Sequence, residues 1–249
     1  MFATEINNYL RDSPVDLFTQ ERCGFACSQG VVEVENTSDN PQESFKFSQE
    51  DTLRCIELVD SGYPVTIWHT HITPGDDDFS YADVCMLKAL DIDSEGLFSL
   101  YLFNPVDNCQ KTLNLKERLE HPYTGREWGW WFNNCYTLVQ DFYLKEFNIK
   151  LNDYHLTERN AWEKPEWNAY MTNFSNEGFV NLGQDISKVQ YGDVLLFKIG
   201  KTHNPNHVAI MLEPEKNTIL HHLVNRLSEK SDFSIGYRNR MEAILRYGK

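Results

Sequence analysis

Apolar positions in the first half of the chain alternate between helical spacing and unbroken β-branched runs. Ile6 and Leu10, followed by Val15, Leu17 and Phe18, predict a short helix at the beginning of the chain. The pattern then predicts, in order, a strand pair, a capped helix, a buried strand, a second capped helix and another strand, over residues 21–36, 48–62, 64–72, 80–91 and 97–105.

A charged stretch over residues 114–127, which contains Pro122 and Gly125, interrupts this pattern and predicts a domain boundary. The pattern then restarts with an amphipathic helix over 135–147. Three strands of an antiparallel sheet follow it, over residues 190–200, 206–213 and 217–224. The order of elements predicts an α+β protein with two domains, residues 1–117 and 118–249.

Composition is that of a globular chain, with 41% hydrophobic and 24% charged residues in 249. The net charge of −14 argues against a nucleic-acid surface, because phosphate neutralisation needs clustered Lys and Arg. The sequence has no secretory signal and no apolar stretch long enough for a membrane span, so we expect synthesis in a cytosol. Six scattered cysteines then predict free thiols rather than a disulfide framework.

A first candidate site lies at the end of the predicted strand 64–72. His69 and His71 alternate along it and share one face, so both imidazoles can bind one ion. Catalytic zinc takes three protein ligands and leaves a position for water, and Asp83 on the following helix supplies the third ligand. Ser80 can hold the water or donate to an oxyanion, and Glu21 is the candidate base, with the nearby Glu33 and Glu35 as alternatives. The alternative is two ordinary strand histidines and a helix-cap acid.

Glu21 before CGF, the pair in WHTH, and Ser80-x-x-Asp83 resemble the JAB/MPN metallopeptidase family over the first domain. The resemblance implies a mixed sheet flanked by helices, Zn²⁺ bound by His69, His71 and Asp83, and Glu21 as the acid–base residue. Two features depart from the family. Ile72 replaces the usual proline, and the loop ITPGDDDF is a residue longer than usual.

A second candidate site centres on Cys135, at the predicted beginning of the helix over 135–147. A helix N-terminus favours thiolate over thiol. A thiol nucleophile also needs a histidine and a partner that orients it, and His207 and His221 lie on consecutive predicted strands. His222 faces the other way. The alternative interpretation of Cys135 is a buried structural thiol.

The blocks NNCYTLVQDFY, YGDVLLF, NHVAIML and ILHHLVNRLS resemble, in this order, the NlpC-type papain-like peptidases from about residue 120 to 249. The resemblance implies a domain with an N-terminal helix and an antiparallel sheet. It also implies Cys135 as nucleophile, His207 as general base and His221 as the third polar residue. Asn134 stands where the family usually has Asp.

Both resemblances imply hydrolysis of amide bonds, and their order in one chain resembles the tail-tip assembly proteins of lambda-like phages. That similarity implies peptidoglycan stem peptides as substrate, other tail-tip proteins as partners, and a place in the virion tail tip after synthesis in the host cytoplasm. Two alternatives stay open. One is a structural tail component whose sites are vestigial or masked, and the other is a cellular isopeptidase acting on a ubiquitin-like tag.

Overall fold

The computed structural model describes residues 2–154, 164–166 and 168–248, and the chain forms two compact units, Met1–His121 and Pro122–Lys249. The boundary expected after residue 117 falls inside α4 (Leu115–Glu120), which belongs to the first unit. Asn114 explains the difference. Its side chain caps α4 through the Glu117 N–H and donates to the carbonyl groups of Gly96 and Phe98. These bonds tie α4 to the first unit.

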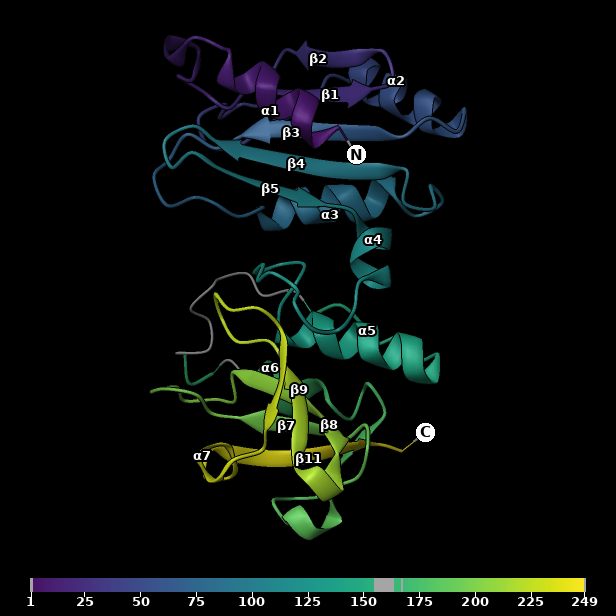
Figure 1. Cartoon of the computed structure of the whole chain (residues 1–249), viewed down its shortest axis with the longest axis vertical. Helices are drawn as coiled ribbons and strands as arrows, with labels where there is room; N and C mark the ends of the chain where they lie inside the picture. The colour runs from purple at the N-terminus through teal and green to yellow at the C-terminus, as the bar shows by residue number, and fades with distance from the viewer. Residues whose placement is uncertain (1, 155–163, 167, 249) are drawn as a thin grey trace. The chain divides into compact units, whose positions relative to one another are not determined.

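The first unit is built on a five-stranded mixed sheet in the order β2-β1-β3-β4-β5, in which only β3 and β4 are parallel (Figure 1). Besides α4, its elements are α1 (Ala3–Arg11), η1 (Val15–Leu17), β1 (Cys23–Cys27), β2 (Gly30–Val34), α2 (Gln49–Asp60), β3 (Val65–Thr70), α3 (Tyr81–Leu90), β4 (Phe98–Asn104) and β5 (Cys109–Leu113). The strand at 109–113 was not predicted from the sequence.

Serine caps begin both central helices of this unit, as the sequence predicted. Ser48 accepts a hydrogen bond from the Asp51 N–H, and Ser80 accepts one from the Asp83 N–H. The prediction of one helix covering the first eighteen residues is wrong in its second half. The helix ends at Arg11, and Val15 lies in a separate 3₁₀ turn with 86% of its surface exposed. Pro14, just before that turn, cannot donate the hydrogen bond that would continue the helix.

Helices cover both faces of this sheet (Figure 1). Ile6 and Leu10 of α1 pack on Ala26, Trp68 and Tyr101. His69 follows Trp68 on β3, so its side chain points to the opposite face, where α2 and α3 lie. The alternation of β3 therefore directs His69 toward the helix that carries Asp83.

The second unit has a six-stranded sheet in the order β10-β9-β8-β7-β11-β6, with every neighbouring pair antiparallel. Its elements are α5 (Cys135–Phe147), α6 (Ala169–Asn173), β6 (Phe179–Asn181), η3 (Ile186–Lys188), β7 (Val194–Phe197), β8 (His207–Glu213), η4 (Pro214–Lys216), β9 (Thr218–His221), β10 (Glu229–Asp232), α7 (Ile235–Arg238) and β11 (Met241–Tyr247). The helix and the β7, β8 and β9 strands confirm the sequence prediction, whereas β6, β10 and β11 were missed.

Helix α5 packs on one face of this sheet through Leu138, Val139 and Phe142, which contact Val208 and Ile210 of β8. The other face has its own buried cluster, which includes Leu195, Phe197 and Ala209. Because side chains alternate along β8, Val208 points to the face that α5 covers, and His207 and Ala209 point to the other face. This separation determines how the candidate thiol site is built.

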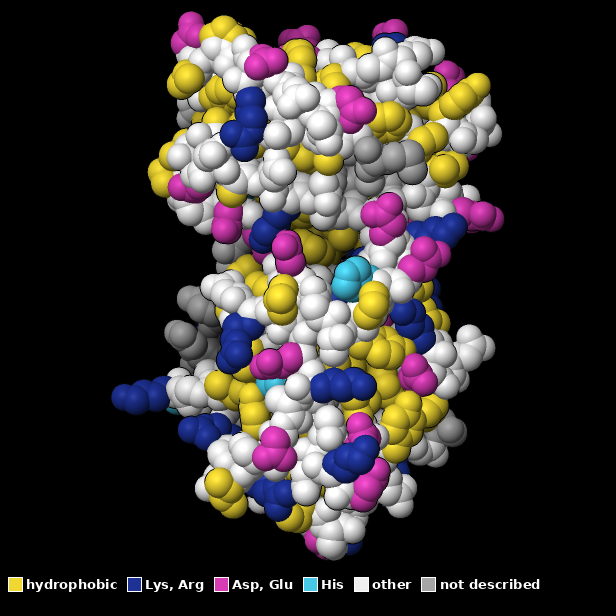
Figure 2. Space-filling model, viewed as in Figure 1, with side chains coloured by type: hydrophobic (Ala, Val, Ile, Leu, Met, Phe, Trp, Pro, Cys, Tyr) yellow, Lys and Arg dark blue, Asp and Glu magenta, His cyan; other side chains and the backbone are white. Residues whose placement is uncertain are grey.

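The net charge is distributed unequally between the units. Residues 1–121 contain 8 Lys and Arg against 22 Asp and Glu, and residues 122–249 contain 15 of each. The whole net charge of −14 therefore lies in the first unit. Acidic and basic side chains are interspersed on the displayed face of the second unit (Figure 2). Within the described residues, no helix has the length and apolar character needed to cross a membrane.

Candidate functional site

Cys135 is the first residue of α5, and the residue before it caps the helix. The side-chain oxygen of Asn134 accepts hydrogen bonds from the backbone N–H groups of Tyr136 (2.9 Å) and Thr137 (3.0 Å). In return, Thr137 Oγ1 accepts a bond from the Asn134 N–H (2.8 Å). This reciprocal cap begins the helix at Cys135, because first-turn N–H groups have no partner within the helix. The sulfur lies at the positive end of the helix dipole.

The thiol of Cys135 is buried, with 6% of the residue exposed. Its Sγ lies 3.6 Å from the Tyr170 hydroxyl, and the backbone amides of Val208 and Tyr136 lie near it. Burial raises the pKa of the thiol, and the hydrogen bonds from Val208, Tyr170 and Tyr136 oppose that rise. Within the part of the chain that the structure describes, Sγ has no hydrogen bond to an imidazole. The resting thiol is therefore neutral.

His207 and His221 form a hydrogen-bonded pair on neighbouring strands. Nε2 of His207 lies 3.1 Å from Nδ1 of His221, and Nε2 of His221 lies 2.9 Å from the Ser231 hydroxyl on β10. Burial lowers the pKa of both imidazoles, that of His207 to about 3, so both rings are neutral near pH 7. Ser231 was missed from the sequence, because its short polar strand carries no pattern that marks it.

The thiol and the histidine pair lie near one peptide of β8 but on different faces of the sheet. His207 packs on Phe197, at 6.0 Å between ring centroids, on the face that α5 does not cover. Val208, the next residue, faces α5, and its backbone amide lies near Sγ. The structure thus brings Cys135 to the residue after His207 without a direct bond between the two side chains.

His222 is completely buried and is separate from the histidine pair. Its Nε2 lies 3.0 Å from the Arg226 carbonyl oxygen, which can only accept, so Nε2 carries the proton. Its ring packs edge-on against Trp128, with centroids 5.2 Å apart. His222 therefore orders the loop after β9, in agreement with the prediction that it faces away from His207.

The first unit gathers His69, His71 and Asp83. Nε2 of His69 lies 3.2 Å from Nε2 of His71 and 3.4 Å from Oδ2 of Asp83, and one ligand atom from each residue lies within 4.8 Å of the others. Thr70 points away and accepts a hydrogen bond from the Arg22 N–H. All three residues are buried, and the set could hold a metal ion.

Three polar residues surround this trio. Glu21 Oε1 lies 4.0 Å from His71 Nε2, and burial raises the pKa of Glu21 to about 7. Ser80 acts as the cap of α3, accepting from the Asp83 N–H while its own N–H donates to Asp83 Oδ2. Asp76 offers His71 Nδ1 its carbonyl oxygen and its carboxylate, each at 3.2 Å. Sequence reasoning missed this role of Asp76, although it noted the acidic run to which Asp76 belongs.

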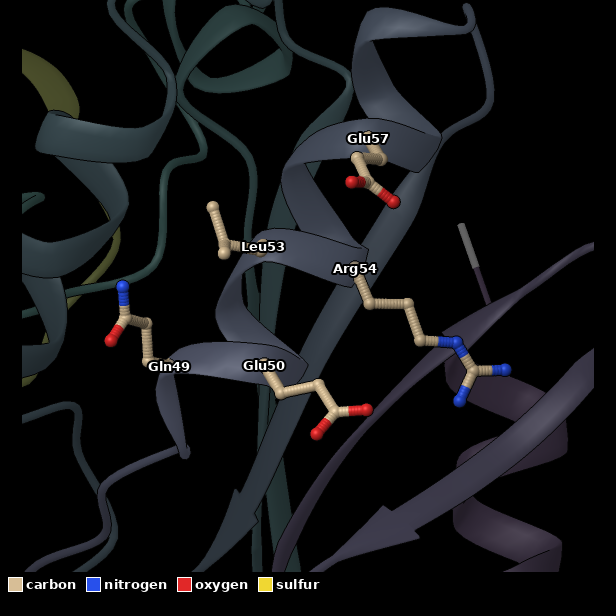
Figure 3. Close-up of a pocket in the computed structure, with 5 residues that line it drawn as sticks. All are labelled: Gln49, Glu50, Leu53, Arg54 and Glu57. Atoms are coloured by element: carbon tan, nitrogen blue, oxygen red, sulfur yellow. The ribbon is translucent and has the colours of Figure 1, made fainter.

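A separate recess follows the exposed side of α2 (Figure 3). It is lined by Gln49, Glu50, Leu53, Arg54 and Glu57. All five residues come from one helix, and none belongs to the thiol site or to the histidine–aspartate trio. The recess therefore adds nothing to either candidate site.

Residues 122–246 match the model of the NlpC/P60 family, and this range is half of the chain and almost all of the second unit. The chain belongs to the NlpC/P60 family, which makes the second unit a hydrolase of the cysteine-peptidase class. The matched range contains Cys135, His207 and His221.

The whole chain is also similar to a phage protein. It is 25% identical over 241 residues to the tail tip assembly protein K of Escherichia phage N15, covering 92% of this chain and 89% of that protein. A crystal structure of an NlpC/P60 family protein from Bacillus cereus aligns with 93% of this chain at 12% identity and a TM-score of 0.33. The chain spans 65% of the length of that bacterial protein.

Proposed function

We propose that the second unit is a cysteine peptidase that cuts stem peptides of peptidoglycan, and that the protein acts in a phage tail tip. The observation that supports this proposal best is the position of Cys135. It begins α5 and lies near the Val208 amide, and the residue before Val208 is His207, which begins the hydrogen-bonded series His207–His221–Ser231. Membership of the NlpC/P60 family and similarity to a protein named for tail tip assembly support the same function.

The proposed mechanism gives each side chain one step. Nε2 of His207 forms a hydrogen bond with His221. Nδ1 of His207 has no hydrogen bond within the described residues, so Nδ1 is the atom that would accept the thiol proton. Sγ then attacks the peptide carbonyl carbon, and the protonated His207 returns the proton to the leaving amine. Water, deprotonated by the same imidazole, releases the acyl group from Sγ. The His207 ring lies on the face of β8 that α5 does not cover, so the proposed transfer requires the ring to move toward Sγ when substrate binds.

Digestion of purified peptidoglycan tests the proposal. The wild-type protein is expected to release muropeptides, and Cys135→Ala is expected to release none. Cys109→Ala is the matched control, because Cys109 is a free thiol of the first unit with no place in either site. If wild type, Cys135→Ala and Cys109→Ala are equally inert on walls, the peptidase proposal fails and the structural role in the tail becomes the better account.

A second candidate function, hydrolysis assisted by zinc in the first unit, is favoured by the spacing of the trio. Zinc bonds of about 2.0–2.1 Å in a tetrahedron place neighbouring ligand atoms about 3.3–3.4 Å apart. The separations of 3.2 Å and 3.4 Å in the trio fit that geometry. Bound zinc would lower the pKa of its water, and Glu21 would hold the water's proton. His69, His71 and Asp83 would be the ligands.

Metal analysis tests this second candidate. The purified protein is expected to contain about one zinc per chain, and His69→Ala is expected to lose it. Chelation should abolish any activity of the first unit and leave the wall digestion by Cys135 unchanged. Loss of both activities under chelation would contradict two independent sites.

A further inference from the structure

Tyr170 is the side chain that contacts the candidate nucleophile. It belongs to α6, and its hydroxyl lies 3.6 Å from Sγ of Cys135, within range of a hydrogen bond to sulfur. Its ring also packs against Tyr136, with centroids 6.1 Å apart and an interplanar angle of 64°. Among the described residues, no other side chain forms a hydrogen bond with Sγ. The sequence patterns drew no attention to Tyr170, which lies 35 positions after Cys135.

The direction of this hydrogen bond follows from the protonation states. A thiolate has no proton and can only accept, whereas the phenol of Tyr170 keeps its proton because burial raises its pKa well above the usual value. Once Cys135 loses its proton, the Tyr170 hydroxyl must therefore be the donor. The backbone amides of Val208, Tyr136 and Cys135 itself also favour the thiolate.

The Tyr170 hydroxyl is important here because, among the described residues, no cationic side chain contacts the sulfur in the resting state. Tyr170 from α6 contacts Sγ, Tyr136 from α5 packs against Tyr170, and His207 begins the strand that carries Val208. All three side chains are neutral. In a thiol–imidazole ion pair, the imidazolium stabilises the thiolate. Without a resting ion pair, hydrogen-bond donors must stabilise the developing charge, and bonds to charged groups are the stronger kind.

We propose that Tyr170 is a catalytic residue of the thiol site, which donates a hydrogen bond to Sγ as His207 removes its proton. The proposal rests on Cys135 being the nucleophile of the proposed function. Tyr170 neither gains nor loses a proton in this step. Its hydroxyl stabilises the negative charge until Sγ bonds to the substrate carbonyl.

The test is the pH profile of Cys135 alkylation by iodoacetamide, followed by mass spectrometry of the tryptic peptide that contains residues 127–145. The variants are Tyr170→Phe and, as the matched control, Tyr136→Phe. Tyr136 is a neighbouring ring whose hydroxyl donates to the Asn152 carbonyl instead of the sulfur (2.9 Å). The midpoint of the profile reports the thiol pKa, and the plateau rate reports access to the buried sulfur, so a change in packing is separated from a change in electrostatics.

Tyr170→Phe is expected to raise the midpoint by about one pH unit, the size expected for one lost hydrogen bond to a charged group. Tyr136→Phe should leave it unchanged. An unchanged midpoint in Tyr170→Phe, with thermal unfolding equal to wild type, overturns the proposal and leaves Tyr170 a packing residue. A Tyr170→Phe chain that unfolds early would be replaced by Tyr170→Trp, a bulky ring with no hydroxyl, under the same criterion.

Alkylation needs no substrate, so this result is distinguishable from the wall digestion. A midpoint shift in a protein that leaves peptidoglycan intact would refute the proposed substrate and keep the role of Tyr170. If the protein digests peptidoglycan but Tyr170→Phe leaves the alkylation midpoint unchanged, the proposed substrate stands and the role of Tyr170 is refuted.

Discussion

Nε2 of His207 lies 3.1 Å from Nδ1 of His221, and this bond joins two strands that the sequence separates by a turn. The β8–β9 register pairs His221 with Ala209, two residues after His207, so both rings lie on the face that α5 does not cover. The bond occupies Nε2, so Nδ1 of His207 is the proton acceptor in the mechanism that we propose. The first expected outcome depends on this arrangement.

Removal of the partner ring should cost most of the activity. In His221→Ala, Nε2 of His207 loses the group that fixes its tautomer, and we expect peptide release to fall about 100-fold, the range of a general acid–base contribution. Ser231→Ala removes only the next hydroxyl and should have a smaller effect. The rates of muropeptide release from the two variants would check this order. Equal rates for His221→Ala and wild type would remove His221 from the mechanism.

The stability of the second unit should fall in mild acid. Burial lowers the pKa of His222 to about 4, below the usual value of about 6.5 in an unfolded chain. Between these pH values the unfolded chain binds more protons than the folded chain. The free energy of unfolding therefore rises with pH, and this contribution of His222 to stability is lost as the pH falls from about 6.5 toward 4. We expect His222→Gln to flatten this dependence by about 2 kcal/mol. Urea unfolding at pH 7.0, 5.5 and 4.5, followed by tryptophan fluorescence, measures it.

Asp76 should set the affinity of the first unit for zinc. Its carbonyl oxygen and carboxylate hold Nδ1 of His71, which orients Nε2 toward His69. Groups that orient a metal-binding histidine in this way change metal affinity about 10–100-fold. We expect Asp76→Asn to bind zinc about 10–100-fold more weakly than wild type, as measured by competition with a chelator. Asp77→Asn, which changes the exposed neighbour, is the control and should bind as wild type.

The buried ion pair between Arg126 and Asp141 should stabilise the beginning of the second unit. The two side chains are 2% and 3% exposed, and the Arg126 N–H also donates to Ser228 Oγ. Asp141→Ala leaves a buried guanidinium without this carboxylate, and we expect a loss of about 3–5 kcal/mol in the free energy of unfolding. The double variant Arg126→Met, Asp141→Leu should recover most of that loss. A double variant as unstable as Asp141→Ala would show that packing, rather than charge, is what the pair contributes.

Local features of this chain were predictable because local physical chemistry determines them. Alternation along a strand directs His69 and His71 to one face, and hydroxyl side chains at Ser48 and Ser80 cap the helices that follow. The polar approach to Cys135 likewise begins a helix at the sulfur. Each of these depends on residues within one turn or one strand of one another.

Tertiary structure alone decided which distant groups complete each site. The insertion of β11 between β7 and β6 and the approach of Tyr170 and Val208 to Sγ join segments far apart in sequence. The contact of Ser231 with His221 depends on the pairing of β10 with β9. No local period encodes such partners, because they are selected by burial and by pairing across the sheet. The neutral state of His207 has the same origin, since only the folded core removes the water that would otherwise solvate its charge.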